Sequence, residues 1–143
     1  MKANELMVGD YVKFTNKYPE KELRGKVAVV VGIRGRIDVR TINDNKYHES
    51  EHPAYFEPTP LTEGILVKNG FSTGKTISGT ELFTCEVTHQ LAGDGFEIQR
   101  ITVYPKWICY IETATTIVRT GITYVHQLQH LLRLCGIKKT IEL

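Results

Sequence analysis

The chain has 143 residues, of which 41% are hydrophobic and 24% are charged. These values lie near globular averages, so we expect a folded protein of one or two small domains and not a disordered segment. Eighteen basic and sixteen acidic side chains leave a net charge of only +2. So small a charge does not support non-specific nucleic-acid binding, which depends on many phosphate contacts.

The three cysteines, Cys85, Cys109 and Cys135, are widely spaced and lie among apolar residues. Their odd number and spacing predict buried thiols in a reducing compartment, because a disulfide framework needs paired cysteines. No apolar run approaches the ~20 residues that span a bilayer, and the N-terminal residues lack the apolar stretch of a secretion signal. We therefore expect a cytoplasmic protein that does not insert into a membrane.

The first sixty residues have the alternation that is typical of β-strands. It predicts strands over 11–14, 26–33 and 36–42. Residues 43–54 are predicted to form a polar loop, and Tyr55-Phe56 a short apolar return. Several short strands, one of them valine-rich and bounded by glycine, are typical of a small SH3-like β-barrel, so we expect an N-terminal domain of that type over residues 1–60.

Residues 61–143 predict a second domain. Thr62 is placed as the N-cap of a helix over 63–69, and Gly70 as its left-handed C-cap. A connector rich in serine, threonine and glycine follows the helix. Three strands of an antiparallel β-meander come next, with a turn at 92–94, and they are predicted over residues 82–90, 95–104 and 107–113.

A second helix is predicted to begin at Thr123 and to end at Gly136. It places Val125, Leu128, Leu132 and Cys135 on one apolar stripe that can cover one face of the meander. A final edge strand is expected over residues 138–143. The expected fold class is therefore α+β, with a small barrel followed by a helix, a meander and a C-terminal helix.

Residues 70–76, Gly-Phe-Ser-Thr-Gly-Lys-Thr, resemble a phosphate-binding loop. That loop has four residues between its glycines and joins a strand to a helix. Here only three residues separate Gly70 from Gly74, and the segment follows a helix. We interpret it as a flexible connector.

Two histidine pairs have the four-residue separation that can hold zinc on a helix. His126 and His130 share one face of the second helix, but no zincin glutamate lies between them. His48 and His52 lie in the polar loop, where no apolar scaffold fixes their geometry. Polar surface is the favoured interpretation of both pairs, with no metal or cofactor expected, and a small metal-dependent hydrolase is an alternative.

Other catalytic groups are not indicated. Glu86 and Glu97 alternate with apolar residues on neighbouring strands and could face each other as paired carboxylates, although an exposed polar sheet face explains them more simply. No serine occupies a nucleophile elbow, and no cysteine has an activating context. No catalytic residue is therefore assigned.

Arg34, Arg36 and Arg40 form the one polar cluster that indicates a binding site. Strand alternation places Arg36 and Arg40 on one face with Asp38 between them, and Arg34 enters from the hairpin. Guanidinium groups that converge in this way bind phosphate or carboxylate. The alternative is that Asp38 neutralises part of the cluster and that the arginines protect an edge strand.

Three separated segments carry a family resemblance: Met7-Val8-Gly9-Asp10-Tyr11-Val12, Pro60-Leu61-Thr62 to Asn69-Gly70-Phe71, and Tyr124-Val125-His126-Gln127-Leu128-Gln129 to Gly136. The chain resembles, over nearly its whole length, a family of small uncharacterised proteins encoded by phages and mobile elements of gut anaerobes. The resemblance implies an accessory protein of a phage or mobile element, without a known activity.

We therefore expect a non-enzymatic cytoplasmic binding protein, whose partner is an unidentified protein or an anionic ligand. An alternative is a small-molecule binder that sequesters a phosphorylated nucleotide signal of host defence, with Arg34, Arg36 and Arg40 as the anion contacts. The metal-dependent hydrolase is the third hypothesis.

Overall fold

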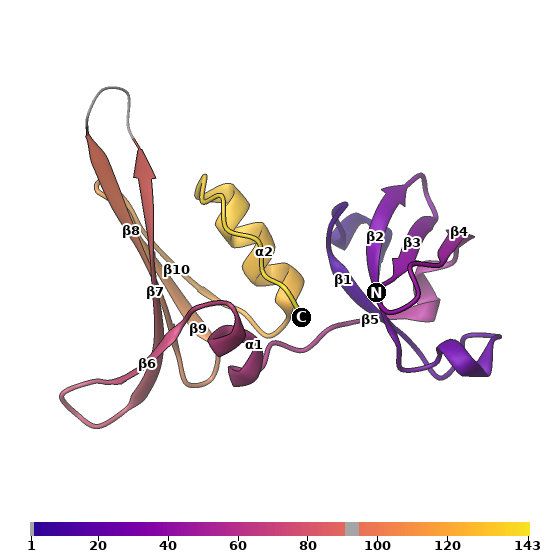
Figure 1. The fold of residues 1–143 in the computed structure, drawn as a ribbon, viewed down its shortest axis with the longest axis horizontal. Coiled ribbons are helices and arrows are strands. Elements are labelled where there is room, and N and C mark those ends of the chain that lie inside the picture. The colour runs from indigo at the N-terminus through magenta and orange to yellow at the C-terminus, as the bar shows by residue number, and fades with distance from the viewer. Residues whose placement is uncertain (1, 91–94) are drawn as a thin grey trace. The chain divides into compact units, whose positions relative to one another are not determined.

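The computed structural model describes residues 2–90 and 95–143, and it has an α+β fold (Figure 1). Two five-stranded antiparallel sheets and two α-helices account for most of it. The chain divides into two compact units, one made of Met1–Pro60 with Tyr124–His126 and the other of Leu61–Thr123 with Gln127–Leu143. No helix in the described part of the chain has the length and apolar character needed to cross a membrane.

The sheet of the first unit has the strand order β4-β3-β2-β1-β5. Its strands are β1 (Tyr11–Phe14), β2 (Val27–Ile33), β3 (Ile37–Thr41), β4 (Tyr47–Glu51) and β5 (Phe56–Pro58). Three short 3-10 helices accompany them: η1 (Ala3–Glu5), η2 (Lys21–Leu23) and η3 (Pro53–Tyr55). The three strands predicted from alternation are confirmed to within one residue at each end.

Aromatic rings fill the core of this unit. The ring centroid of Phe14 lies 4.6 Å from that of Tyr18 and 5.0 Å from that of Phe56. The ring of His48 joins them at 5.6 Å from Phe14. These rings are buried together with the inward-facing aliphatic residues of β1, β2 and β3, which are Val12, Ala28, Val30, Ile37 and Val39.

Residues 43–54, which we expected to be a polar loop, contain β4. This strand pairs with β3, and Val39 lies opposite His48. The turn before it is held by Thr41, whose hydroxyl donates to the carboxylate of Asp44 and, as the largest cause, lowers the pKa of that carboxyl group. The prediction failed because the one inward-facing residue in the middle of β4 is a histidine.

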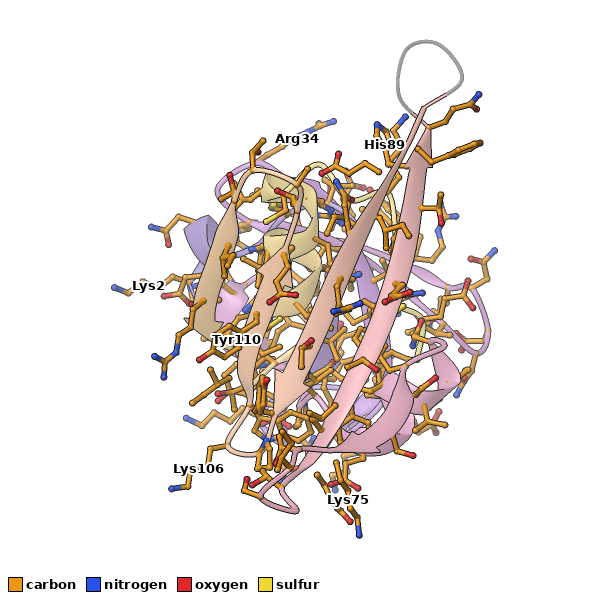
Figure 2. All side chains as sticks on the ribbon, turned by 90° about the vertical axis from the view of Figure 1, so that its left-hand side faces the viewer. Lys2, Arg34, Lys75, His89, Lys106 and Tyr110 are labelled. Atoms are coloured by element: carbon orange, nitrogen blue, oxygen red, sulfur yellow. The ribbon has the colours of Figure 1, made fainter. Side chains whose placement is uncertain are left out.

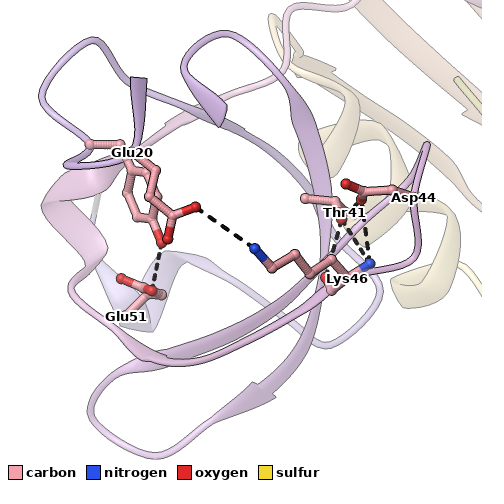
Figure 3. Close-up of polar contacts among 6 residues, drawn as sticks. Glu20, Thr41, Asp44, Lys46 and Glu51 are labelled. Atoms are coloured by element: carbon pink, nitrogen blue, oxygen red, sulfur yellow. Dashed lines mark hydrogen bonds and ion pairs between the residues drawn. The ribbon is translucent and has the colours of Figure 1, made fainter. Parts of the chain in front are cut away.

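No closed barrel is found among the described residues, because β4 and β5 form the two edges of the sheet and do not pair with each other. Side chains from the β1–β2 connection instead contact β4 and the turn that precedes it (Figure 3). The hydroxyl of Tyr18 donates to Glu51 Oε1 at 2.7 Å, and Lys46 Nζ lies 3.9 Å from Glu20 Oε2. Burial and the bond to Glu51 raise the pKa of Tyr18 above its ordinary value of 10.

The second unit contains a sheet of order β10-β9-β8-β7-β6. Its strands are β6 (Ser72–Lys75), β7 (Glu81–Gln90), β8 (Phe96–Tyr104), β9 (Ile108–Glu112) and β10 (Ile117–Gly121). The helices are α1 (Glu63–Lys68) and α2 (Val125–Leu134). The three strands predicted for the meander are β7, β8 and β9, and the expected turn at 92–94 lies outside the described residues.

The helix ends follow the predicted caps. The hydroxyl of Thr62 accepts a hydrogen bond from the backbone N–H three residues later, at 3.3 Å. Gly70 and Gly136 have φ values of 78° and 70°, the left-handed conformation that favours glycine after a helix. The second helix begins at Val125 and not at Thr123, whose N–H donates to the side chain of Gln127 at 2.7 Å.

Two strands at the edges of this sheet were not expected. The connector at 70–76 contains β6, which pairs with β7, so the interpretation as a flexible connector was wrong. A Cβ atom at Gly74 would lie 3.2 Å from Leu82 Cδ1, so this glycine permits the close approach of the two strands. At the other edge, β10 pairs with β9 over five residues.

The edge strand expected over 138–143 is not formed. The side-chain amide of Asn69 instead makes both hydrogen bonds that a neighbouring strand would make there. Its Nδ2 donates to the Glu142 carbonyl at 2.7 Å, and its Oδ1 accepts from the Glu142 N–H at 2.8 Å. This segment therefore docks through a side chain, and Ile141 within it is fully buried.

The core of the second unit lies between α2 and one face of the sheet (Figure 1). Three members of the predicted helix stripe, Val125, Leu128 and Leu132, are fully buried, whereas Cys135 follows the end of α2 and is only partly buried. The sheet contributes buried residues from its three central strands: Cys85, Ile101, Val103, Cys109 and Ile111. All three cysteines are free thiols, and burial raises the pKa of Cys109 to about 12, so this thiol is protonated at neutral pH.

We predict that Leu128→Ala lowers the free energy of unfolding by ~2 to 5 kcal/mol, because it leaves a cavity under a fully buried side chain. Leu134→Ala is the matched control, since Leu134 lies on the same helix with 81% of its surface exposed, and it should change stability by less than ~0.5 kcal/mol. Urea denaturation of both variants measures the difference. Equal losses in the two variants would contradict the packing of α2.

Candidate functional site

One face of the second sheet has no helix over it in the described structure (Figure 1), and Figure 2 looks onto this face with Tyr110 at its front. Residues opposite each other on paired strands point to the same side, so the register defines the face. We call it the open face. Its side chains on β6 to β10 belong to Ser72, Leu82, Thr84, Glu86, Thr88, Gln90, Phe96, Ile98, Arg100, Thr102, Tyr104, Ile108, Tyr110, Glu112, Ile117 and Arg119.

A row of hydroxyl groups crosses the open face. Ser72, Thr84, Thr102 and Tyr110 lie opposite one another on β6, β7, β8 and β9, which are neighbours at roughly 4.8 Å. Their hydroxyl groups form no hydrogen bond within the described chain. The guanidinium carbon of Arg119 lies 5.4 Å from the ring centroid of Tyr110 and continues the row onto β10. The row therefore offers both hydrogen-bond donors and acceptors to a ligand.

An ionic row lies beside the hydroxyl row. Arg100 Nε and Nη2 donate to Glu86 Oε1 at 3.0 and 2.8 Å, and Arg100 Nη1 lies 4.0 Å from Glu112 Oε2. The hydrogen bond to Glu86 is the main cause that raises the pKa of Arg100. About half of each side chain is exposed, so solvent screens these pairs and the row contributes little to stability.

Ser72, Thr84 and Thr102 of the hydroxyl row and all three residues of the ionic row line a hollow of about 610 Å³, together with Tyr104. The ring of Tyr104 lies 5.2 Å from that of Tyr110 in an edge-to-face arrangement. The charges of the open face balance, because Glu86 and Glu112 are matched by Arg100 and Arg119. The site is thus polar, aromatic and close to neutral.

Large apolar side chains lie on the open face outside the hollow. Phe96, Ile98 and Ile117 have 67%, 60% and 68% of their surfaces exposed. Phe96 and Ile98 belong to the first part of β8, whereas Arg100, Thr102 and Tyr104 follow them along the strand toward the hollow. Exposed apolar side chains grouped on one face are typical of a surface that binds another molecule.

The predicted arginine cluster lies in the first unit. Arg36 Nη1 donates to the carbonyl of Ser50 at 3.1 Å, and Asp38 Oδ1 accepts from the Ser50 N–H at 2.8 Å. The side chain of Arg40 is exposed and makes no hydrogen bond or ion pair with another described residue. Arg36 is thus engaged with β4, while Arg40 is available to a ligand.

Arg34 precedes β3 in the hairpin, where its N–H donates to the Arg36 carbonyl at 3.0 Å. Its charge acts on Tyr47, which lies opposite Arg40 on β4. Partial burial and the nearby Asp38 raise the pKa of Tyr47, and Arg34 opposes that effect. The cluster therefore includes an exposed aromatic ring that alternation alone did not indicate.

The two histidine pairs have different surroundings. His48 is buried in the aromatic core, while the Nδ1 atom of His52 accepts a backbone N–H at 3.1 Å at the start of η3. On α2, His126 is buried and its ring stacks on Tyr124 at 5.8 Å. In residues 2–90 and 95–143 no three His, Cys, Asp or Glu side chains are grouped so that they could hold a metal ion.

The suggested pairing of Glu86 with Glu97 is wrong. Glu86 lies opposite Arg100 on the open face, whereas Glu97 lies opposite His89 on the other face. Glu97 Oε1 accepts a hydrogen bond from the Ala114 N–H at 2.9 Å. The partner of Glu86 was missed because alternation gives the parity of each strand and not the register between strands.

Comparisons with protein-family models, with curated proteins and with solved structures found no match for this chain.

We predict that Arg100→Gln and Glu86→Gln leave the melting temperature unchanged within experimental error, because the ionic row is exposed and screened. Ile101→Ala is the control on the same strand. Its side chain is fully buried on the other face, so it should cost ~2 to 5 kcal/mol. Thermal denaturation of the three variants tests the assignment of faces, and a large loss in either polar variant would contradict it.

Proposed function

We propose that this chain is a non-enzymatic binding protein that acts through the open face of its second sheet. The observation that carries the proposal is the composition of that face. It combines exposed apolar side chains, two tyrosines and two arginines, and tyrosine, phenylalanine and arginine are the residues enriched at recognition surfaces. The family resemblance supports a cytoplasmic accessory protein of a phage or mobile element.

The exposure of this face argues for a binding role. Phe96, Ile98 and Ile117 are each more than half exposed. Polar side chains would suit these positions better if the face stayed in contact with water. The core on the other face does not need them, since α2 covers it. Apolar side chains at these positions gain burial only when another molecule covers the face.

For the first unit we propose an SH3-like barrel with incomplete closure. Two features support it: the first strand lies between the second and the last strand, and a 3-10 helix directly precedes the last strand. In this barrel, the side-chain contacts of Tyr18 with Glu51 and of Lys46 with Glu20 hold together the side that strand pairing leaves unclosed.

We predict that Ile98→Glu combined with Ile117→Glu abolishes partner binding. The test isolates the tagged protein from the cells that carry it and identifies bound molecules by native mass spectrometry. Ile77→Glu is the matched control, because Ile77 is fully exposed and lies in the β6–β7 connection, outside the open face. The wild type and the control should retain the same partner. A partner that the double variant also retains would show that the open face is not the binding surface.

A second candidate function is anion binding at Arg34, Arg36 and Arg40, with a phosphorylated nucleotide as the ligand. The observation that favours it is the exposed guanidinium of Arg40 opposite the exposed ring of Tyr47, because such a pair can contact a phosphate and stack on a base.

We predict that Arg36→Gln combined with Arg40→Gln weakens nucleotide binding at least tenfold, because it removes the available guanidinium of Arg40, worth ~1.5 to 3 kcal/mol as a charge-assisted contact, together with the neighbouring charge of Arg36. Cyclic and linear nucleotides are titrated at low and moderate salt, since screening must weaken a charge contact. Arg119→Gln, in the second unit, is the control and should bind like the wild type. Equal binding by the double variant would remove the arginine site.

A further inference from the structure

We propose that the hollow of the open face binds a short neutral oligosaccharide. This inference rests on the proposed function, because the hollow lies on the same open face, beside the exposed apolar side chains. Sugar rings carry neighbouring hydroxyl groups that each donate and accept hydrogen bonds, together with apolar C–H faces. A site for them needs alternating donors and acceptors next to an aromatic ring, and the hollow contains both.

The ionic row supplies alternating hydrogen-bond donors and acceptors. Glu86 and Glu112 are acceptors, and Arg100 between them is a donor with a fixed fork of N–H groups. Nη1 of Arg100 lies 4.0 Å from Glu112, which is too long for a hydrogen bond. One sugar hydroxyl could therefore accept from Arg100 and donate to Glu112, thereby joining two groups that do not bond to each other.

The hydroxyl row supplies adaptable partners. Thr84 and Thr102 line the hollow on adjacent strands, and Ser72 extends the row onto β6. Only 7% of the surface of Thr102 is exposed, and its hydroxyl forms no hydrogen bond within the described chain. A hydroxyl group can act as donor or acceptor, so this row can adjust to the hydroxyl groups of a sugar.

Tyr104 supplies the aromatic surface. Its ring lines the hollow, and its edge-to-face contact with Tyr110 limits its movement. An aromatic ring can pack against the C–H face of a sugar while its phenol group stays hydrated. The two rows and this ring therefore form adjacent polar and apolar strips on one sheet face.

The charge and size of the hollow distinguish this ligand from two others. Two carboxylates and one guanidinium line it, which disfavours nucleic acid and phosphorylated compounds. A protein segment would be expected to insert an apolar anchor, but the exposed Phe96 and Ile98 lie outside the hollow and its lining is mainly polar. A volume of about 610 Å³ lies within the usual range of small-molecule sites.

The test is isothermal titration of the full chain with cellohexaose, chitohexaose, maltohexaose and xylohexaose. We expect the wild type to bind at least one of them. Thr84→Val combined with Thr102→Val keeps the side-chain shape but removes two hydrogen-bonding groups, so binding should weaken at least fivefold. Tyr104→Ala should weaken it at least tenfold. Circular dichroism verifies that each variant is folded.

Thr120→Val is the matched control. Thr120 is exposed on β10 of the same sheet, but it lies opposite Cys109 and therefore belongs to the other face. Its variant should bind the hexasaccharide like the wild type. Binding should also be independent of ionic strength, since the ligand carries no charge. A heparin hexasaccharide, which is strongly anionic, should not bind.

Three results would overturn the inference: no hexasaccharide binds at millimolar concentration, the double valine variant binds as well as the wild type, or only the heparin fragment binds. The proposed function fails separately. If Ile98→Glu with Ile117→Glu loses a partner protein while no sugar binds to the wild type, the open face is a protein-binding surface and only the oligosaccharide inference is wrong.

Discussion

The alternation of side chains along β8 is the constraint on which the second unit depends. This strand is the middle one of its sheet, so its odd and even residues face different surroundings. Ile101 and Val103 point toward α2 and are fully buried, whereas Arg100 belongs to the ionic row and Thr102 to the hydroxyl row. The hydrophobic burial that holds the helix to the sheet therefore also determines which polar groups reach the open face.

Local patterns were sufficient for the central elements. The valine-rich strand β2 has no polar side chain over its seven residues, and Thr62 and Gly70 delimit α1 through caps that need no distant partner. The apolar stripe of α2 repeats at helical spacing and includes Leu128 and Leu132. Each of these signals lies within one segment of the chain, which is why the fold class and these element positions could be predicted.

Edge strands escaped prediction because they bury few side chains. No side chain of β6 is buried, and in β4 the inward-facing His48 is polar. Neither strand has the apolar alternation that indicates a sheet. The docking of Glu142 on Asn69 was not predicted for another reason: the side-chain amide of Asn69 takes the place of a neighbouring strand. Such contacts between distant residues leave no periodic trace in the sequence.

The candidate site depends on register, which is the least local property of the sheet. Threonine at 84 and 102 and arginine at 100 give no motif in the sequence, and they meet only because β7 and β8 pair with Thr84 opposite Thr102. A slip of one residue would move Arg100 into the core and Ile101 into water. The unpaired charge in the apolar interior makes that alternative costly. The burial that excludes the wrong register therefore also aligns the hydroxyl and ionic rows. A site of this kind can form without any local sequence motif.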